Sequence, residues 1–416
     1  MKRILSLALC CALLLTSLPG CATSSAKELS APKITANPAG REEVNAALAE
    51  FGLSLLQRAR TAGEEPQGTL LSPLSVALAL SMTANGADGT TLAQFLEVLG
   101  GGLPQEELNG ACVQLMQDYQ NLGGSTRCSI ANSLWTDPDW SIQEDFIGTC
   151  RGVFDAQVFQ AELSSQGVVR DLNAWVSQHT NKMIPQIVNQ PFDESTAALM
   201  VNALYLKNKW AHPFSPNSTG AREFTREDGS KVKLDFLNAG SYTFPYLQGE
   251  GAQGVVLPYD DGRLAFFALL PDLYPDAPAF EEWLSSLEGQ ALSRLLSNRQ
   301  EDTLFLHLGL PKFTAEWRGE LTGILPELGL EEAFQPGDAD FSRLGDAPEG
   351  YYISQVIHAA KIEVNEKGTE AAAATVVAAS GGGAPADGIT LVFDRPFLYG
   401  IVDLYTGVPL FLGTYE

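Results

Sequence analysis

The chain has 416 residues, 45% of them hydrophobic, and a formal net charge of −24 at pH 7. A chain of this length and composition can bury a large hydrophobic core. The negative charge argues against a nucleic-acid partner, because affinity for phosphates comes from Lys and Arg. It suits an exported domain that meets basic partners.

The N-terminal residues have the layout of a secretory signal peptide. Lys2 and Arg3 precede an apolar run to about Leu15, which is shorter than the ~20 residues that cross a bilayer. The run leads to Leu18-Pro19-Gly20-Cys21, which resembles a bacterial lipobox. The resemblance implies a lipoprotein signal peptide over residues 1–20 and a lipid anchor on Cys21; the alternative is an ordinary signal peptide with an incidental cysteine.

We therefore expect an exported protein, either a membrane-anchored lipoprotein at the bacterial cell surface or an extracellular form. Its only contact with the membrane would be the N-terminal lipid. Residues 21–42 are rich in Ala, Ser, Pro and Lys and show no periodicity, which predicts a flexible tether.

The body, residues 43–416, changes pattern once along the chain. Apolar residues at three- and four-residue steps predict helices over 44–59, 72–87 and 168–188. Ser72 precedes Pro73 and is expected to cap the second of these helices. Apolar segments typical of strands prevail from about residue 196, interrupted by helical patterns over 280–287 and 321–328. The predicted strands cover 198–206, 254–259, 264–271, 302–313, 360–366, 389–404 and 408–415. This order predicts one α+β domain.

The sequence contains little that indicates enzyme chemistry. It has no G-x-S-x-G elbow, Walker loop, H-E-x-x-H or dinucleotide fingerprint, so we expect no cofactor and no metal. A serine hydrolase that uses Ser72 or Ser75 with His358 stays a remote alternative, because nothing nearby marks a nucleophile. Cys112, Cys128 and Cys150 could form one disulfide or remain three thiols.

The stretch from Glu366 to Gly388, EKGTEAAAATVVAASGGGAPADG, is unusual for its small side chains. No charged residue occurs between Glu370 and Asp387. Read alone, it suits a flexible linker or a short Ala-rich helix, which would be marginal in water. Its position directly before the last apolar strands needs another explanation.

Motifs along residues 43–416 are similar to those of the serpin family. The segment EKGTEAAAAT (366–375) resembles the serpin hinge, and FDRPF (393–397) and PLFLG (409–413) resemble the strands that follow the reactive loop. Further matches are LSPLS (71–75), ANSLW (131–135), VNALYLKNKW (201–210), LPKF (310–313) and LGLEEAF (328–334). Each match is weak evidence alone, but the matches together, in this order, are specific for the family.

The resemblance implies a serpin fold: three β-sheets, eight to nine helices and an exposed reactive loop. It implies a monomeric serine protease inhibitor that acts as a suicide substrate. The protease cuts the loop, and the freed loop then inserts as a strand into a large sheet. The hinge would comprise Glu366, Lys367, Gly368, Thr369, Glu370, Ala371, Ala372, Ala373 and Ala374. Ser72, Ser75, Asn202 and His358 would form a hydrogen-bonded gate, the shutter, and Trp210 would lie where insertion starts, the breach.

The side chains of the loop meet the demands of insertion. Because a strand alternates its faces, Thr369, Ala371, Ala373, Thr375, Val377 and Ala379 would share one buried face, and all are uncharged. Residues 368–382 would span roughly 50 Å. At ~1 kcal/mol net for each new ladder bond, insertion gains on the order of 10–30 kcal/mol, which is large beside ordinary stabilities of ~5–15 kcal/mol. A kinetically trapped native state is therefore expected.

A non-inhibitory serpin acting as a binding module is the runner-up, but its usual mark, a hinge with charged or bulky residues, is missing.

The bait bond is expected between residues 377 and 386. This window, VAASGGGAPA, has no basic and no large apolar residue, so it suits a protease with a small specificity pocket, of the elastase type. The family's usual spacing places the scissile bond at one position when counted from the hinge, and at another when counted back from the strands that follow the loop. The region that contains the scissile bond is therefore Ala379, Ser380, Gly381, Gly382, Gly383 and Ala384.

Overall fold

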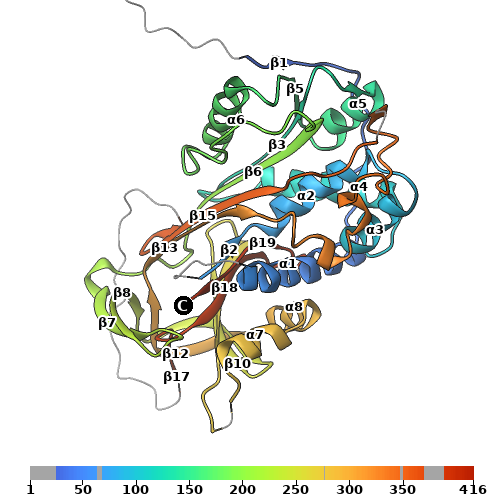
Figure 1. Ribbon diagram of the computed structural model, residues 1–416. Helices are drawn as coiled ribbons and strands as arrows, with labels where there is room; N and C mark the ends of the chain where they lie inside the picture. The colour runs from blue at the N-terminus through green and yellow to red at the C-terminus, as the bar shows by residue number, and fades with distance from the viewer. Residues whose placement is uncertain (1–24, 63–67, 276, 347–349, 370–387) are drawn as a thin grey trace, which may run out of the picture.

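The structure, a computed structural model, describes residues 25–62, 68–275, 277–346, 350–369 and 388–416. These residues form eight α-helices and three sheets (Figure 1). The predicted α+β architecture with three sheets is confirmed, and eight helices is within the expected range. The helices are α1 (Glu42–Ala62), α2 (Pro73–Ala84), α3 (Gly89–Gly100), α4 (Gln105–Gln120), α5 (Glu144–Val153), α6 (Gln166–His179), α7 (Phe280–Ser286) and α8 (Gly289–Ser297).

The seven-stranded sheet carries the features that matter for function. Its order is β1 (Lys27–Glu28), β5 (Gln157–Gln160), β3 (Arg127–Thr136), β6 (Ala198–Lys209), β16 (Gly368–Thr369), β15 (Ile357–Asn365) and β13 (Phe313–Glu320). The two residues of β16 belong to the predicted hinge. They lie between β6 and β15 and pair with both.

A ten-stranded sheet contains most of the C-terminal strands. Its path is β2 (Leu70–Leu71), β19 (Pro409–Tyr415), β18 (Phe397–Asp403), β11 (Leu264–Pro271), β10 (Ala252–Pro258), β9 (Tyr242–Gly249), β12 (Gln300–Pro311), β8 (Lys231–Ala239) and β7 (Gly220–Thr225), with β17 (Ile389–Val392) beside β12. The third sheet pairs β4 (Ser141–Ile142) with β14 (Gly345–Asp346). Short 3-10 turns complete the fold: η1 (Pro216–Ser218), η2 (Pro326–Leu328) and η3 (Glu332–Phe334).

The two faces of β6 pack against different cores. Leu204 and Leu206 belong to the main core, which also contains α2 and the ten-stranded sheet. Leu199, Val201 and Ala203 pack with the apolar face of α6 in a second core. This alternation follows from the period of two along a strand. The seven-stranded sheet is therefore covered on both faces.

Several predicted elements differ from the structure. The helix expected over 168–188 ends at His179, because Asn181 and Lys182 adopt positive φ angles of 49° and 65°. Residues 321–328 form turns and η2 in place of a helix. The strand expected over 389–404 is divided into β17 and β18, with Pro396 between them. β3 lies in the half of the chain that was expected to be helical.

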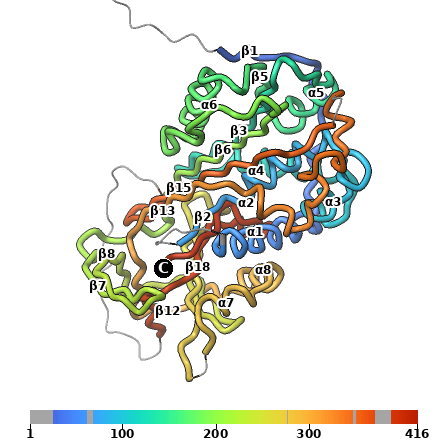
Figure 2. The backbone as a smooth tube through the Cα atoms, viewed as in Figure 1, coloured from blue at the N-terminus to red at the C-terminus, as the bar shows by residue number. Residues whose placement is uncertain are grey.

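The predicted tether is wrong for residues 25–41, which are docked on the body as an N-terminal arm (Figure 2). The arm begins with Ser25, whose hydroxyl donates to Asp171 of α6 at 2.8 Å. It then adds β1 to the edge of the seven-stranded sheet and crosses α5, where the Ile34 amide donates to the Gly148 carbonyl at 3.0 Å. Composition alone could not reveal this, because the arm is held by backbone bonds and by small residues of the body.

The three body cysteines are free thiols. Cys112 and Cys150 are buried, and burial raises the pKa of the Cys112 thiol to about 12. Of the two alternatives left open by the sequence, the structure therefore has three thiols.

Candidate functional site

The candidate site is the interval between β6 and β15, which we call the slot. Within the described residues, β6 pairs along its length with β3 on one side, and on the other side only Lys209 and Asn208 pair, with Gly368 and Thr369 of β16. β15 pairs with β13 on its far side and with β16 at its end. No described ladder joins β6 to β15 directly.

Gly368 brings the chain into the slot, and its position requires glycine. Its φ is +150°, and a Cβ there would lie 2.7 Å from the Cα of Lys209 and closer still to the carbonyl oxygen of Asn208. Backbone occupies that space, so a side chain could not be accommodated by moving a rotamer. The chain thus passes close to β6 and starts a strand at Thr369.

Thr369 is buried, with 1% of its surface exposed, and its hydroxyl lies 2.6 Å from that of Tyr259. Tyr259 is equally buried, and this burial raises the pKa of its phenol. The inward direction of Thr369 agrees with the face assigned to it from sequence alternation. Tyr259 was missed, since nothing in its local sequence marks a hinge partner.

Trp210 lies directly against the hinge. Its indole Nε1 donates to the carbonyl of Asn365 at 2.8 Å, and its amide donates to the carbonyl of Lys367 at 3.0 Å. Its ring stacks on Tyr259, with 4.9 Å between ring centroids and 5° between planes. The structure therefore places Trp210 at the end of the slot where the hinge enters.

Glu366 fixes the approach to this end. Its carboxylate pairs with Lys312 at 3.1 Å and accepts from the Thr219 hydroxyl at 3.0 Å. Burial alone would raise the pKa of Glu366, but hydrogen bonds from its own backbone, Lys312 and Thr219 outweigh it and lower that pKa. Glu366 therefore anchors the hinge as an ionised group.

The four residues expected to form the shutter lie farther along the slot, where α2 and the residue before it meet β6 and β15. They form two separate hydrogen-bonded pairs. The amide of Ser72 donates to Nε2 of His358 at 3.0 Å, while the Ser75 hydroxyl donates to Oδ1 of Asn202. Ser72 is the N-cap residue of α2, as predicted, but its hydroxyl makes no capping bond; it donates to the Leu410 carbonyl at 2.8 Å. Ser75 lies in α2 and Ser72 directly before it, and each strand beside the slot supplies one partner.

Asn132 of β3 extends the second pair and was not predicted as a shutter residue. The Asn202 amide donates to Oδ1 of Asn132 at 2.6 Å, and the Asn132 amide donates to the Phe154 carbonyl at 2.7 Å. Its occurrence in the ANSLW motif was the available signal. This chain of polar groups therefore connects α2 with the two neighbouring strands β6 and β3, while the Ser72–His358 pair stays separate.

His358 is 5% exposed, and burial lowers its pKa to about 4. The imidazole is therefore neutral at pH 7. Because Nε2 accepts a hydrogen bond from Ser72, the proton lies on Nδ1. Neither Ser72 nor Ser75 donates its hydroxyl to His358, so these residues lack the geometry of a hydrolase nucleophile and base.

Some predicted residues lie outside the described part of the chain. They are Cys21, Glu370, Ala371, Ala372, Ala373, Ala374, Ala379, Ser380, Gly381, Gly382, Gly383 and Ala384. Among the described residues, no group of three or more His, Cys, Asp or Glu side chains could hold a metal ion. The described helices include none with the length and apolarity of a membrane span.

The fold and the site define a class of protein in which a further strand begins inside the main sheet, here as β16 between β6 and β15. Residues 46–416 match the family model described as Serpin (serine protease inhibitor). The putative serpin-Z5 of rice (Oryza sativa subsp. japonica) is 33% identical over 398 residues, 88% of each chain. Plasminogen activator inhibitor 1 of Sus scrofa is 31% identical over 370 residues, 88% of this chain and 90% of that protein.

Solved structures agree with this. The native state of the thermophilic serpin tengpin is 33% identical and superposes with a TM-score of 0.82, covering 93% of this chain and 99% of that chain. Human thyroxine-binding globulin, 22% identical over 90% of this chain and 98% of that chain, has a TM-score of 0.79 and shows the likeness of fold alone. The chain belongs to the serpin family.

Proposed function

We propose that the protein inhibits serine proteases as a suicide substrate, by insertion of its reactive loop into the slot. The observation that carries the proposal is the position of β16: Gly368 and Thr369 form the start of a strand between β6 and β15. The family match and the inhibitors among the relatives support the same class of activity.

The register of β16 supports the rest of the path. Thr369 is paired with Asn208 on one side and with Val364 on the other, both antiparallel. Continued in the same register, an inserted Thr375 would lie opposite Asn202 and His358. Both are shutter residues, so the growing strand would reach the gate with a small polar side chain on the buried face.

For the target we propose proteases of the elastase type, because residues 377–386 offer only small side chains around the bait bond. The protein would act outside the cell or at its surface, with the lipid on Cys21 as its only membrane contact, and as a monomer. The negative charge would accelerate encounter with basic proteases.

The test is incubation with a panel of serine proteases, followed by SDS gels and N-terminal sequencing of the released C-terminal fragment. We expect SDS-stable complexes with elastase-like enzymes, none with trypsin, and cleavage within residues 377–386. A stable trypsin complex, or elastase cleavage elsewhere, would contradict the proposed specificity.

Melting temperatures before and after loop cleavage distinguish the proposed inhibitor from the runner-up, a non-inhibitory binding module. Loop cleavage should raise the melting temperature greatly if the loop inserts, and should leave it unchanged in a non-inserting serpin. Turnover of ester substrates tests the hydrolase alternative, for which we expect no activity.

A further inference from the structure

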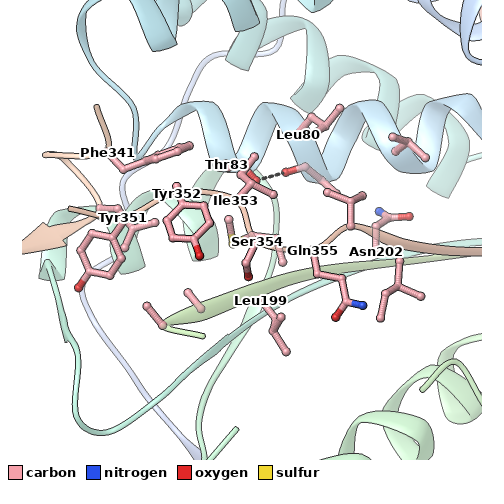
Figure 3. Close-up of a pocket in the computed structure, with 18 of the residues that line it drawn as sticks. Leu80, Thr83, Leu199, Asn202, Phe341, Tyr351, Tyr352, Ile353, Ser354 and Gln355 are labelled. Carbon is pink, nitrogen blue, oxygen red and sulfur yellow. Dashed lines mark hydrogen bonds between the residues drawn. The ribbon is translucent and has the colours of Figure 1, made fainter. Parts of the chain in front are cut away.

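A pocket lies at the end of the slot away from the hinge (Figure 3). It contains about 800 Å³ of space not filled by atoms, part of it open to solvent. One wall is α2, a second is the first residues of β6, and the third is the extended segment 351–358. Phe341, Tyr351 and Tyr352 gather at one end of the pocket, and Asn202 lies at the other.

The lining has no charge. None of the described residues around the pocket is Asp, Glu, Lys or Arg, although the chain as a whole carries a net charge of −24. Leu80, Leu199, Met200, Phe341 and Ile353 supply much of the apolar surface. Transfer of an ion into such a site is costly without a partner, so the pocket favours an uncharged occupant.

Most polar groups of the lining already have partners. The Thr83 hydroxyl donates to the Ala79 carbonyl at 2.8 Å, and the Tyr351 hydroxyl donates to the Ser141 carbonyl at 2.8 Å. Ser75 and Asn202 bind each other. These groups hold the walls in place and are not free to bind a ligand strongly.

Tyr352 and Ser354 are exposed, and among the buried polar side chains of the lining His358 is the exception. Its Nε2 is occupied by the Ser72 amide, so its Nδ1 carries a proton, and that N–H has no acceptor among the described residues. The side chain is 95% buried and lines the pocket. Nδ1 is not among the described buried side-chain atoms without a partner, so it is open to the pocket that His358 lines, where a ligand oxygen could replace water as its acceptor.

We propose that this pocket binds an uncharged single-chain lipid, such as a monoacylglycerol, whose ester or hydroxyl oxygen accepts the Nδ1–H of His358. The chain would extend from His358 towards Phe341 and Tyr351. The five residues of β6 along this path, Ala198–Asn202, span about 13 Å, a length that suits an acyl chain of moderate size. An uncharged headgroup agrees with both the lining and the net charge.

The occupied pocket has a consequence for inhibition, which rests on the proposed function. The same two segments, β6 near Ala198–Asn202 and residues 353–358, flank both the pocket and the path of an inserting strand. Lipid and strand would exclude each other. A lipid-bound inhibitor would be cut before insertion is complete, so more inhibitor molecules would be consumed for each protease trapped.

Binding is tested on the full mature chain without any protease. The probe is 1-lauroyl-glycerol below its micellar concentration, followed by displacement of the neutral dye Nile red. We expect one molecule bound per chain, with laurate and dodecyltrimethylammonium at least tenfold weaker. Equal binding of the charged analogues would overturn the proposal.

Variants locate the site. Ala79→Phe fills the pocket from α2 and should weaken binding at least tenfold. The matched control Ala46→Phe, on an exposed helical alanine of α1 that lines other hollows, should bind as the wild type does. Met200→Trp fills the pocket from β6 and replaces Ala79→Phe if that variant does not fold. Unchanged binding in the folded pocket variant would overturn the assignment.

Two further readouts separate the claims. In protein labelled with ¹⁵N-histidine, the ligand should shift the Nδ1 resonance of His358, and an unchanged resonance would overturn the proposed hydrogen bond. With elastase, a saturating ligand should raise the stoichiometry of inhibition at least twofold; an unchanged value would overturn the exclusion of the strand. Absence of any protease complex in the ligand-free wild type would instead contradict the proposed function and leave the binding result standing.

Discussion

Thr369 and Tyr259 are 110 positions apart in the sequence, and their buried hydroxyls lie 2.6 Å from each other. Tyr259 is also stacked on Trp210, whose indole binds the chain just before the hinge. The first inserted side chain is therefore bonded to Tyr259, which is itself held by Trp210, and no local motif connects Tyr259 to the hinge. A charge at this position would have neither space nor a partner.

Thr369→Arg should convert the inhibitor into a substrate. The guanidinium would enter a buried face, at a cost of several kcal/mol, so insertion would stall and the protease would be released. On SDS gels with elastase, we expect cleaved protein and little or no complex. Thr369→Ser keeps the hydroxyl and the small volume, and should retain complex formation. A stable complex with the Arg variant would show that insertion does not pass through this position.

Motif resemblance predicted the fold, which is confirmed, whereas local periodicity predicted its helices and strands unevenly. The patterns over 44–59 and 72–87 correspond to α1, which presents an apolar face to the core, and to α2, which is buried on nearly all sides. The strand β3 could not be recognised as an element of its own from periodicity within a helical half. Tyr259 and Asn132 were missed because their roles depend on contacts across distant parts of the chain.

The N-terminal arm shows a second limit. Its composition is typical of a linker, yet its backbone is seated against the glycines of α5 and α4. Such docking depends on the absence of side chains in the partner helices. The sequence of the arm alone therefore cannot predict that it docks.

His358 should make stability depend on pH. Its pKa in the folded protein is about 4, below the ordinary value of ~6.5 expected when unfolded. Between these values the unfolded chain binds more protons, so stability is complete above about pH 6.5 and falls as pH decreases towards 4, by on the order of 3 kcal/mol.

The check is urea unfolding of wild type and His358→Gln at pH 7 and pH 4.5. Gln can accept the Ser72 amide but does not titrate, so its loss of stability at pH 4.5 should be smaller than that of the wild type. The carboxylates of the chain titrate in both proteins, so their contributions to the pH dependence cancel in the comparison. Equal losses in the two proteins would show that His358 is not the titrating group.

The net charge should influence the speed of inhibition more than its outcome. If encounter with a basic elastase is steered by charge, raising NaCl from about 20 mM to 500 mM should reduce the second-order rate of inhibition. The stoichiometry should not change, because insertion occurs after the complex forms. A neutral elastase-like protease is the control, and a rate without salt dependence for the basic enzyme would contradict steering.

Cys21→Ala should release the protein from the membrane. If Cys21 carries the lipid, only residues 22–24 separate it from the docked Ser25, a reach of at most ~14 Å. The body would be held close to the bilayer. Fractionation of cells should find the wild type with membranes and the variant in the soluble exported fraction; the same distribution for both would refute the lipid anchor.

Gly148→Ala should have opposite effects with and without the N-terminal arm. Gly148 is in the middle of α5, and a Cβ there would lie 3.3 Å from Cγ1 of Ile34 and closer to the carbonyl oxygen of Pro32. In the full mature chain the added methyl group should displace the arm and lower the free energy of unfolding by about 1–3 kcal/mol. With residues 22–40 deleted, nothing opposes the better helix propensity of Ala, and the same change should stabilise by about 0.5–1 kcal/mol.

Gly100→Ala is the matched control for this reversal. A Cβ at Gly100 of α3 meets Leu108 at an ordinary contact distance of 3.8 Å and does not touch the arm. Its effect should have the same sign in both backgrounds. Urea unfolding of the six proteins, two backgrounds with three sequences each, measures all the differences. If Gly148→Ala stabilises the full chain as it does the truncated one, the arm does not occupy the groove on α5 in solution.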